Sequence, residues 1–526
     1  MKKIFKFYAA IIGILLCASS CKKSFDDLTV NTNVPTKMPA SLLFKGILNN
    51  MLDAPDGKKE IYSQYYIYNY DYYGDNRYDL EEGDNYYTSL KNVKAMEEQA
   101  INAGSATVNP YSAVGKFFRA YFFSKMSMQV GDIPMTQSLQ GIENLKPAYD
   151  TQKSVMLQSL ALLESSNADF TSLIANGGNT LSGDIYFGGN LSQWQKVVNT
   201  YRIRLLLQLS KKASDADLNV PAQFAAIVNN PTKYPIMQSP ADNLQYIYVE
   251  PTNFYPQNPN NFGNEGSRKN SSATYIGLLT QLKDPRVFVT AEPARNLVDD
   301  LKQSPIAFSS FVGADPGLDL GEMYNNAGLQ KYSFINRKRY YSTFTGESSI
   351  QIGFPELMFN IAEGINRGWA SGDAESYYIN GIKSSFQFYN IPTGTGTFNA
   401  SFYRPGSKST ADAANYDTYP INVNWDNYYA QSNVKYEVGS TGLTQILQQK
   451  YLALFRHSGL ESYFTYRRTG VPNFTTGPGT GNGARIASRF KYSKYERSAN
   501  TDNYTKALAS QYGGNDDING VMWILK

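Results

Sequence analysis

Six segments of the chain space their apolar residues as an α-helix requires, and this pattern constrains the fold more than any other feature. Residues three, four and seven positions apart lie on one face of a helix, so each segment presents an apolar stripe that must pack against a neighbour. The stripes comprise Phe44, Ile47, Leu48 and Met51; Val114, Phe117, Phe118 and Tyr121; Met156, Leu160 and Leu163; Trp194, Val197, Val198, Tyr201, Leu205 and Leu209; Met358, Ile361, Ala362 and Ile365; and Leu447, Tyr451, Leu454 and Phe455. We predict a mostly α fold, because no strands alternate with these helices as a parallel sheet would require.

Long irregular stretches separate the predicted helices. Residues 251–272 and 473–483 are rich in turn-forming residues such as Asn, Pro, Gly and Ser, and residues 391–442 mix Gly, Thr, Asn, Tyr and Pro. Loops of this length in a compact protein are usually functional or disordered. We therefore expect a helical scaffold with loop-rich insertions at about 230–350 and 391–442.

The first twenty residues have the parts of a secretory signal peptide. Three lysines precede the apolar run 7–16, which is about half the roughly 20 residues needed to span a bilayer. Small residues at 18–20 then lead to Cys21, the arrangement of a bacterial lipoprotein signal in which the cysteine thiol is acylated. We predict a signal over 1–20, lipidation at Cys21 and a tether over 21–40; the alternative is an ordinary signal peptide with a chance cysteine.

Composition excludes several classes of protein and site. The only cysteines are Cys17 and Cys21, so the folded part has no disulfide, thiol nucleophile or cysteine metal site. The formal charge of +4 falls to about +1 once the three lysines of residues 1–20 are removed, which argues against a nucleic-acid partner. The single histidine, His457, rules out most Ser–His–Asp and metal arrangements, and we expect it to be structural.

Carboxylates are plentiful, and they leave two possibilities open. A pair of them could hydrolyse glycosides, and the sequence alone does not exclude this. An acid-rich stretch contains Asp71, Asp75, Asp79, Glu81, Glu82 and Asp84. Its spacing does not match a Ca²⁺-binding loop, so we interpret it as a solvated charged loop, with a structural Ca²⁺ as the alternative. No other cofactor is predicted.

A dense run of tyrosines between residues 62 and 78 is the best candidate for ligand binding. Its second half contains Gly74 and reads as a turn, where aromatic faces lie beside hydrogen-bonding side chains. The Asn-rich loop 251–272 is a plausible opposite wall, because long polar loops on a rigid scaffold commonly carry binding residues. The predicted ligand contacts are Tyr72, Tyr73, Asn76, Arg77, Tyr78, Asn261, Asn264 and Arg268. The alternative is that the tyrosine rings only pack beneath a loop.

Several local patterns together resemble the SusD/RagB family of nutrient-binding outer-membrane lipoproteins. The segment 354–369 resembles the family's helix with an Ala-Glu pair, here Ala362-Glu363, and 446–472 resembles a block that ends in two arginines and a glycine. The patterns at 489–500 and 513–524 are similar to the family's closing segments, and AYFFSKMSMQVGDIPMTQSL, WQKVVNTYRIRLLLQLS and KDPRV are similar to segments nearer its front. Ser493 stands where proline is common, and Thr465-Tyr466 stand where an aspartate is common, which indicates a divergent branch.

The resemblance implies a non-catalytic protein with tetratricopeptide-like helix pairs and a loop-rich variable region, forming one SusD-like domain over 41–526. It implies a place on the outer membrane, facing outside, as a lid on a SusC-like TonB-dependent transporter that receives oligosaccharides or peptides. It also brings Glu363 close to Arg467 and Arg468, and we expect one of these arginines to pair with it. The remaining alternatives are a membrane-anchored glycoside hydrolase and a structural surface adhesin.

Overall fold

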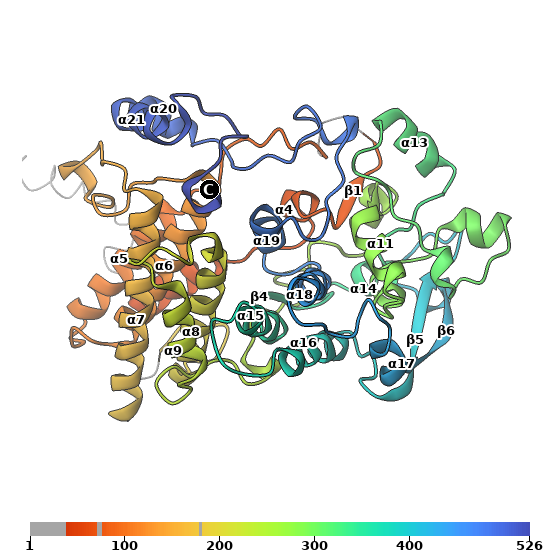
Figure 1. Ribbon diagram of the computed structural model, residues 1–526, viewed down its shortest axis with the longest axis horizontal. Helices are drawn as coiled ribbons and strands as arrows, with labels where there is room; N and C mark the ends of the chain where they lie inside the picture. Colours follow the sequence, from red (N-terminus) through yellow and green to blue (C-terminus); the bar gives the residue numbers. More distant parts are fainter. Residues whose placement is uncertain (1–37, 71–75, 178–180) are drawn as a thin grey trace, which may run out of the picture.

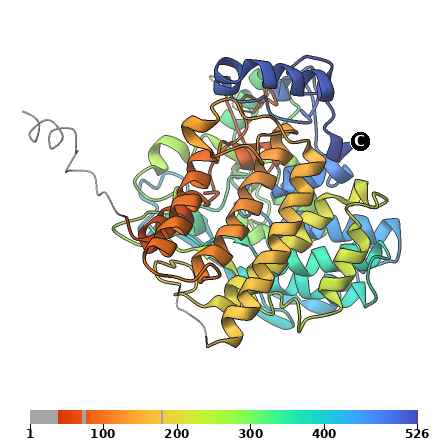
Figure 2. The ribbon, with the colours of Figure 1, turned by 90° about the vertical axis from the view of Figure 1, so that its left-hand side faces the viewer.

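The computed structural model describes residues 38–70, 76–177 and 181–526, and its long helices form the scaffold of the protein (Figure 1). Helices of the N-terminal half pack in chain order, each against the next, and they stand side by side in Figure 2. These are α3 (Ala40–Asn50), α5 (Tyr87–Asn102), α6 (Pro110–Val130), α7 (Gln152–Ala175), α8 (Leu191–Gln208) and α9 (Val220–Val228). The predicted stripes within them are buried, as the helical spacing required.

Capping residues define where these helices begin. The side-chain oxygen of Asn109 accepts hydrogen bonds from the amides of Tyr111 and Ser112, at 2.9 and 3.0 Å, at the start of α6. Thr151 accepts from the amide of Ser154 at the start of α7 in the same way. Such caps satisfy backbone N–H groups that the first helical turn leaves without partners.

Four further helices occupy the centre of the molecule in Figure 1: α15 (Phe354–Asn366), α16 (Ala374–Phe388), α18 (Ser440–Ala453) and α19 (Glu461–Thr469). Helix α15 joins two apolar cores. Its Leu357 and Ile361 belong to the core of the N-terminal helices, whereas Phe359 and Ala362 belong to a second core with α16 and α18. The mostly α prediction and its helix pairs are therefore confirmed.

The predicted contact between Glu363 and an arginine also exists. Arg468 of α19 donates to both carboxylate oxygens of Glu363, at 2.5 and 2.9 Å, and Arg367 donates to one of them at 2.9 Å. Glu363 and Arg468 are buried, whereas Arg467 instead donates to the carbonyls of Ser488 and Met128. Burial alone would raise the pKa of Glu363, but the charges and hydrogen bonds of the two arginines lower it to about 2.

The other side of the molecule consists of short elements and long connections. Its helices are α10 (Phe262–Glu265), α11 (Ala273–Gln281), α12 (Val287–Thr290), α13 (Leu320–Gly328), α14 (Arg337–Tyr341) and α17 (Trp425–Tyr429). Three two-stranded antiparallel sheets pair β1 (Tyr66–Tyr68) with β3 (Lys269–Ser271), β2 (Leu244–Tyr246) with β4 (Ser349–Ile352), and β5 (Thr395–Tyr403) with β6 (Tyr416–Asn424).

The β5–β6 hairpin refines the expectation of a loop-rich insertion over 391–442. Nine residues of each strand pair in register, from Thr395 opposite Asn424 to Tyr403 opposite Tyr416. Side chains alternate across the strands, so Ala400, Phe402 and Ile421 are buried while their neighbours are more exposed. The period of two is present in the sequence, but the surrounding Gly, Thr and Asn residues concealed it.

Smaller elements complete the described chain. The remaining α-helices are α4 (Lys58–Tyr62), α20 (Lys494–Ala499) and α21 (Thr501–Tyr512). The short 3-10 and π elements are Gly141–Glu143, Ser210–Lys212, Pro240–Asp242, Asn296–Asp300, Phe308–Ser310, Ala413–Asn415, Pro478–Thr480 and Trp523–Leu525. None of the helices in the described ranges combines the length and the apolar character that a membrane crossing needs.

Candidate functional site

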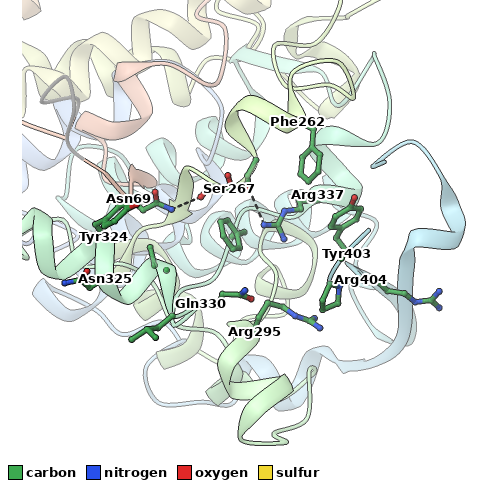
Figure 3. A pocket seen from close by; sticks show the side chains of 18 residues that line it. Asn69, Phe262, Ser267, Arg295, Tyr324, Asn325, Gln330, Arg337, Tyr403 and Arg404 are labelled. Atoms are coloured by element: carbon green, nitrogen blue, oxygen red, sulfur yellow. Dashed lines mark hydrogen bonds between the residues drawn. The ribbon is translucent and has the colours of Figure 1, made fainter. Parts of the chain in front are cut away.

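A pocket with a volume of about 820 Å³ opens among the short elements, and we name it the Tyr324 pocket (Figure 3). It lies between α10, α13, the residues that lead into α14, and the turn that follows β5. Its lining residues are Asn69, Phe262, Gly263, Gly266, Ser267, Arg295, Tyr324, Asn325, Ala327, Gly328, Leu329, Gln330, Phe334, Arg337, Tyr403, Arg404, Pro405 and Gly406.

Helix α13 presents the most exposed aromatic ring of the pocket. The side chain of Asp319 caps this helix by accepting hydrogen bonds from the amides of Gly321 and Glu322, at 2.9 and 3.3 Å. Tyr324 follows on the outer face with 62% of its surface exposed. A tyrosine ring on a capped helix offers a flat contact surface at a low cost in rotamer entropy.

Arg337, at the first position of α14, forms the inner wall. It donates to the carboxylate of Glu292 at 2.7 Å and to the carbonyl of Gly266 at 3.2 Å, the bond drawn in Figure 3. Its guanidinium lies 4.0 Å from the centre of the Phe334 ring. Burial raises the pKa of Glu292 above its usual value, although the charge of Arg337 opposes the shift. Arg337 is therefore held in place from three sides.

The two other arginines of the pocket are also paired with carboxylates. Arg295 makes a two-pronged contact with Asp299, at 2.8 and 3.0 Å, and Arg404 donates to Asp417 at 2.7 Å. Because each arginine already has an acidic partner, the pocket presents little net positive charge. It offers planar groups and hydrogen-bond donors, which suit a neutral polar ligand.

The described residues that line the Tyr324 pocket include no carboxylate. Hydrolysis of a glycoside normally needs two carboxyl groups on either side of the scissile bond. The described lining of this pocket does not contain such a pair, and it offers an aromatic ring and hydrogen-bonding side chains.

The structure describes only part of the predicted tyrosine turn. Tyr72 and Tyr73 lie outside the described residues. Asn76 is buried, and its side chain makes two hydrogen bonds with the backbone of Tyr68. Its oxygen accepts from the N–H of Tyr68 at 2.8 Å, and its nitrogen donates to the carbonyl of Tyr68 at 2.6 Å. Tyr78 is only 1% exposed, and its hydroxyl donates to the carbonyl of Tyr62 at 2.8 Å. The structure thus places Asn76 and Tyr78 in the interior, where they stabilise the chain instead of facing a ligand.

The Asn-rich loop does contribute to the pocket, but in the described structure only through residues that were not predicted: Phe262, Gly263, Gly266 and Ser267. Asn261 donates to the carbonyl of Pro256 at 2.5 Å, which holds the loop together. Asn264 lies in α10, and its side chain is outside the described part of the structure. Arg268 is exposed and lies against the ring of Tyr70, with its guanidinium 5.2 Å from the ring centre. It follows Ser267, which accepts a hydrogen bond from Asn69 on the pocket wall at 2.8 Å.

Arg77 is exposed and lines a different, smaller pocket of about 380 Å³ together with acidic residues of the stretch considered for Ca²⁺. Asp71 and Asp75 of that stretch lie outside the described residues. Asp84 accepts from Lys59 at 2.7 Å, and Asp79 accepts from the amide of Asn482 at 3.0 Å. Among the residues that the structure describes, no group of three or more His, Cys, Asp or Glu side chains is placed to hold a metal ion.

His457 and Cys21 complete the predicted positions. His457 is buried, its Nδ1 accepts from the amide of Ile350 at 3.4 Å, and burial lowers its pKa to about 4. The imidazole is therefore neutral at physiological pH, in keeping with a structural role. Cys21 precedes the described residues.

Sequence reasoning missed the residues that build most of the pocket. Arg295, Tyr324, Arg337 and Tyr403 are spread over more than a hundred positions and form no local motif. The one available signal was Asp319 three residues before Glu322, the pattern of a helix start, followed by the exposed tyrosine.

Comparison with known proteins gives a consistent result. A SusD-like family model, described as "Starch-binding associating with outer membrane", matches residues 32–493. A SusD homologue of known structure from Bacteroides fragilis is 28% identical with a TM-score of 0.80, and the match covers 93% of this chain and all of that one (100%). A second B. fragilis homologue is also 28% identical, with a TM-score of 0.76 and the same coverage of both chains, 93% and 100%.

More distant structures share the fold. A chitin-binding SusD homologue from Flavobacterium johnsoniae is 20% identical with a TM-score of 0.67, covering 93% of this chain and 98% of that one. At this identity the match shows the fold alone. A search among curated proteins found no match.

Proposed function

The chain belongs to the SusD-like family of outer-membrane nutrient-binding proteins, and from this premise we propose that it captures an oligosaccharide in the Tyr324 pocket. We propose further that Cys21 carries a lipid anchor, that the protein faces outside, and that it passes its ligand to a SusC-like TonB-dependent transporter. The observation that carries the proposal is the pocket itself. It combines an exposed aromatic ring with amide and guanidinium donors and has no carboxylate in its described lining.

An oligosaccharide fits this pocket better than a peptide does. Sugar rings have apolar faces that stack on aromatic side chains, and their hydroxyls suit Asn325, Gln330 and the paired arginines. The family model that matches this chain is described as starch-binding, which supports a saccharide ligand here. Peptide capture is the second candidate on family grounds, and the test below separates the two.

The first test measures affinity by calorimetry against neutral oligosaccharides (chito-, malto- and xylo-oligosaccharides) and against a tripeptide library. For the ligand that binds, Tyr324→Ala should weaken affinity by about thirtyfold, because a central aromatic contact contributes on the order of 2 kcal/mol. Tyr495→Ala is the matched control: Tyr495 is 66% exposed, close to the 62% of Tyr324, but lies outside the pocket.

Equal effects of the two variants would place the ligand elsewhere. Tight peptide binding without saccharide binding would show that the ligand is a peptide and not an oligosaccharide. Shortened sugar products after prolonged incubation would favour the glycoside-hydrolase alternative.

The second test addresses anchoring and delivery. Cys21→Ala should move the protein from the membrane fraction to the soluble fraction, whereas Cys17→Ala should not, since bulky Leu15 and Leu16 precede Cys17. The wild-type protein should co-purify with a co-expressed SusC-like transporter from detergent extracts. A Cys21→Ala protein that stays in the membrane fraction would exclude lipid attachment at this residue as the anchor.

A further inference from the structure

A second pocket, with a volume of about 640 Å³, lies at the opposite end of the β5–β6 hairpin from the Tyr324 pocket. The Tyr324 pocket uses Tyr403, the last residue of β5, whereas the second pocket uses Thr395, the first. We name it the Lys283 pocket. It is separate from the first pocket, because the two share no lining residue.

The floor of the Lys283 pocket is apolar. The rings of Phe288 and Phe308 lie against each other with their centres 5.0 Å apart. Ile421 and Val423, on the inner face of β6, are buried beside them. Such a floor can accept the apolar face of a ring or a chain.

Polar side chains on the rim have unused hydrogen-bonding groups. Thr397 donates to the side-chain oxygen of Asn422 at 2.8 Å, which orients that amide. The amide nitrogen of Asn422 then has no partner among the described residues. The side chain of Asn427 likewise has none in the described structure, although its backbone N–H is bound by Asn424. The rim therefore presents two free amide donors, of which that of Asn422 is oriented by Thr397.

Lys283 is the one charged residue among those that line this pocket in the described structure. It is exposed, and it forms no ion pair with any described residue. Its backbone lies in the left-handed region, with φ of +47°, a strained conformation for a residue that has a side chain. The Tyr324 pocket differs on this point, since each of its arginines already has a carboxylate partner.

A buried network holds the turn that carries Lys283. Asp284 pairs with Arg286 at 2.7 Å and accepts from the hydroxyl of Tyr428, a lining residue, at 2.6 Å. Gln431 donates to the carbonyl of Leu282 at 3.0 Å. The strained turn is thus supported from behind, and Lys283 remains on the pocket side of it with its charge unpaired.

An anionic saccharide satisfies these groups better than an acidic peptide does. A peptide strand would add to the open edge of β6 through backbone hydrogen bonds, but Pro420 lacks the N–H that this would use in the middle of the strand. Recognition here must depend on side chains, and spaced amides and hydroxyls suit the hydroxyls of a sugar. A carboxylate on that sugar supplies the negatively charged partner that Lys283 does not have within the described protein.

We propose that the Lys283 pocket is a second binding site, specific for an oligosaccharide that carries carboxylate groups. Phe308 and its apolar neighbours pack against the sugar, Lys283 binds the carboxylate, and Asn422 and Asn427 bind hydroxyls. The proposal rests on this pocket alone and does not require the Tyr324 pocket to bind a ligand.

The test compares tetragalacturonate and tetramannuronate with their methyl esters, which keep the rings and remove the charge. Wild-type protein should bind at least one acid, and Lys283→Gln should weaken that binding by about tenfold, since a charge-assisted hydrogen bond is lost. Binding of the methyl ester should be weaker in the wild type and unchanged by Lys283→Gln. Raising the salt concentration should weaken binding of the acid only.

Matched variants separate the two pockets. Lys91→Gln removes an exposed lysine of α5 that lines neither pocket and should change nothing. Tyr324→Ala should leave acid binding intact, so failure of the Tyr324 site and failure of this one give different results. Asn422→Ala should also weaken acid binding, and thermal unfolding of each variant should match the wild type.

Three results would overturn the proposal. One is that the wild-type protein binds neither acidic oligosaccharide. The second is that Lys283→Gln binds them as the wild type does. The third is that tetraglutamate binds through Lys283 as tightly as the sugars do, which would assign the pocket to acidic peptides.

Discussion

Glu363 with Arg468 and Asp417 with Arg404 are the same chemical pair in two regions of the molecule. In the helical centre the carboxylate of Glu363 is fully buried and Arg468 is 1% exposed, whereas beside the Tyr324 pocket the side chains of Arg404 and Asp417 are 51% and 40% exposed. A buried pair that loses one partner leaves a charge without water, while an exposed pair exchanges its partner for water at little cost.

The difference shows how the protein divides its tasks. The helical centre uses charge to join α15 and α19, two helices about a hundred residues apart in sequence. Beside the Tyr324 pocket, the charges of Arg404 and Asp417 are paired but remain in contact with solvent. Variants in the two regions should therefore differ in stability, from several kcal/mol in the helical centre to almost nothing beside the pocket.

Glu363→Ala should lower the free energy of unfolding by about 3–5 kcal/mol, because it leaves Arg468 buried without its partner. Denaturant titration gives this value directly. Arg367→Ala serves as the matched control, since Arg367 is 23% exposed and water can replace it; its loss should cost about 1 kcal/mol or less. Equal losses for the two variants would contradict the difference between buried and exposed partners.

Acid should remove the contribution of Glu363 in a defined window. The pKa of Glu363 is about 2 in the folded protein against an ordinary 4.5, so the unfolded chain takes up the proton first as the pH falls. The stabilisation is complete above pH 4.5 and is lost towards pH 2, a change of about 3 kcal/mol at 1.36 kcal/mol per pKa unit.

Unfolding of the wild type and of Glu363→Gln over this range isolates the effect. The stability difference between them should be largest near pH 7 and should shrink between pH 4.5 and 2. A difference that stays constant with pH would show that Glu363 does not carry the charge assigned to it.

Tyr78→Phe should cost about 1 kcal/mol of stability, because it removes the buried hydrogen bond to the carbonyl of Tyr62. Ligand affinity should not change. Tyr324→Phe is the control at an exposed position. Because the ring of Tyr324 is exposed, this variant should change the free energy of unfolding by less than about 0.5 kcal/mol. If Tyr78→Phe lost ligand affinity while its stability stayed unchanged, Tyr78 would have to contact the ligand.

Asp417→Asn should change the free energy of unfolding by less than about 0.5 kcal/mol, since both partners of the pair are largely solvated. Chemical denaturation at low and high salt checks this. A loss near that of Glu363→Ala would mean that the region around the pocket is stabilised by charge in the same way as the helical centre.

The fold followed from local patterns to a large extent. Stripes such as Trp194, Val197 and Val198 predicted buried helix faces, and all three are buried. Helical spacing is a property of neighbouring residues, so it is visible without knowing what the helix packs against. The β5–β6 hairpin was less visible, because its alternation is diluted by Gly, Thr and Asn.

The pairing of Glu363 with an arginine came from the family resemblance and not from local pattern. Only the structure identified the partner as Arg468, because helix packing determines which guanidinium reaches the carboxylate. Arg467, its immediate neighbour, points to the carbonyls of Met128 and Ser488 instead.

The sequence by itself determined the helical scaffold and the class of the protein, because both depend on residues close together in the chain. Only the tertiary structure decided which polar and aromatic residues line a pocket and which are buried. Tyr78 is buried because its amide binds the carbonyl of Thr480 and its ring lies near Tyr463, contacts that cross about four hundred residues. Tyr324 stays exposed because no distant segment of the described chain covers α13 at that point. Outside the apolar helix stripes, the burial of a side chain is set by which distant segments meet, and local spacing gives no signal of that.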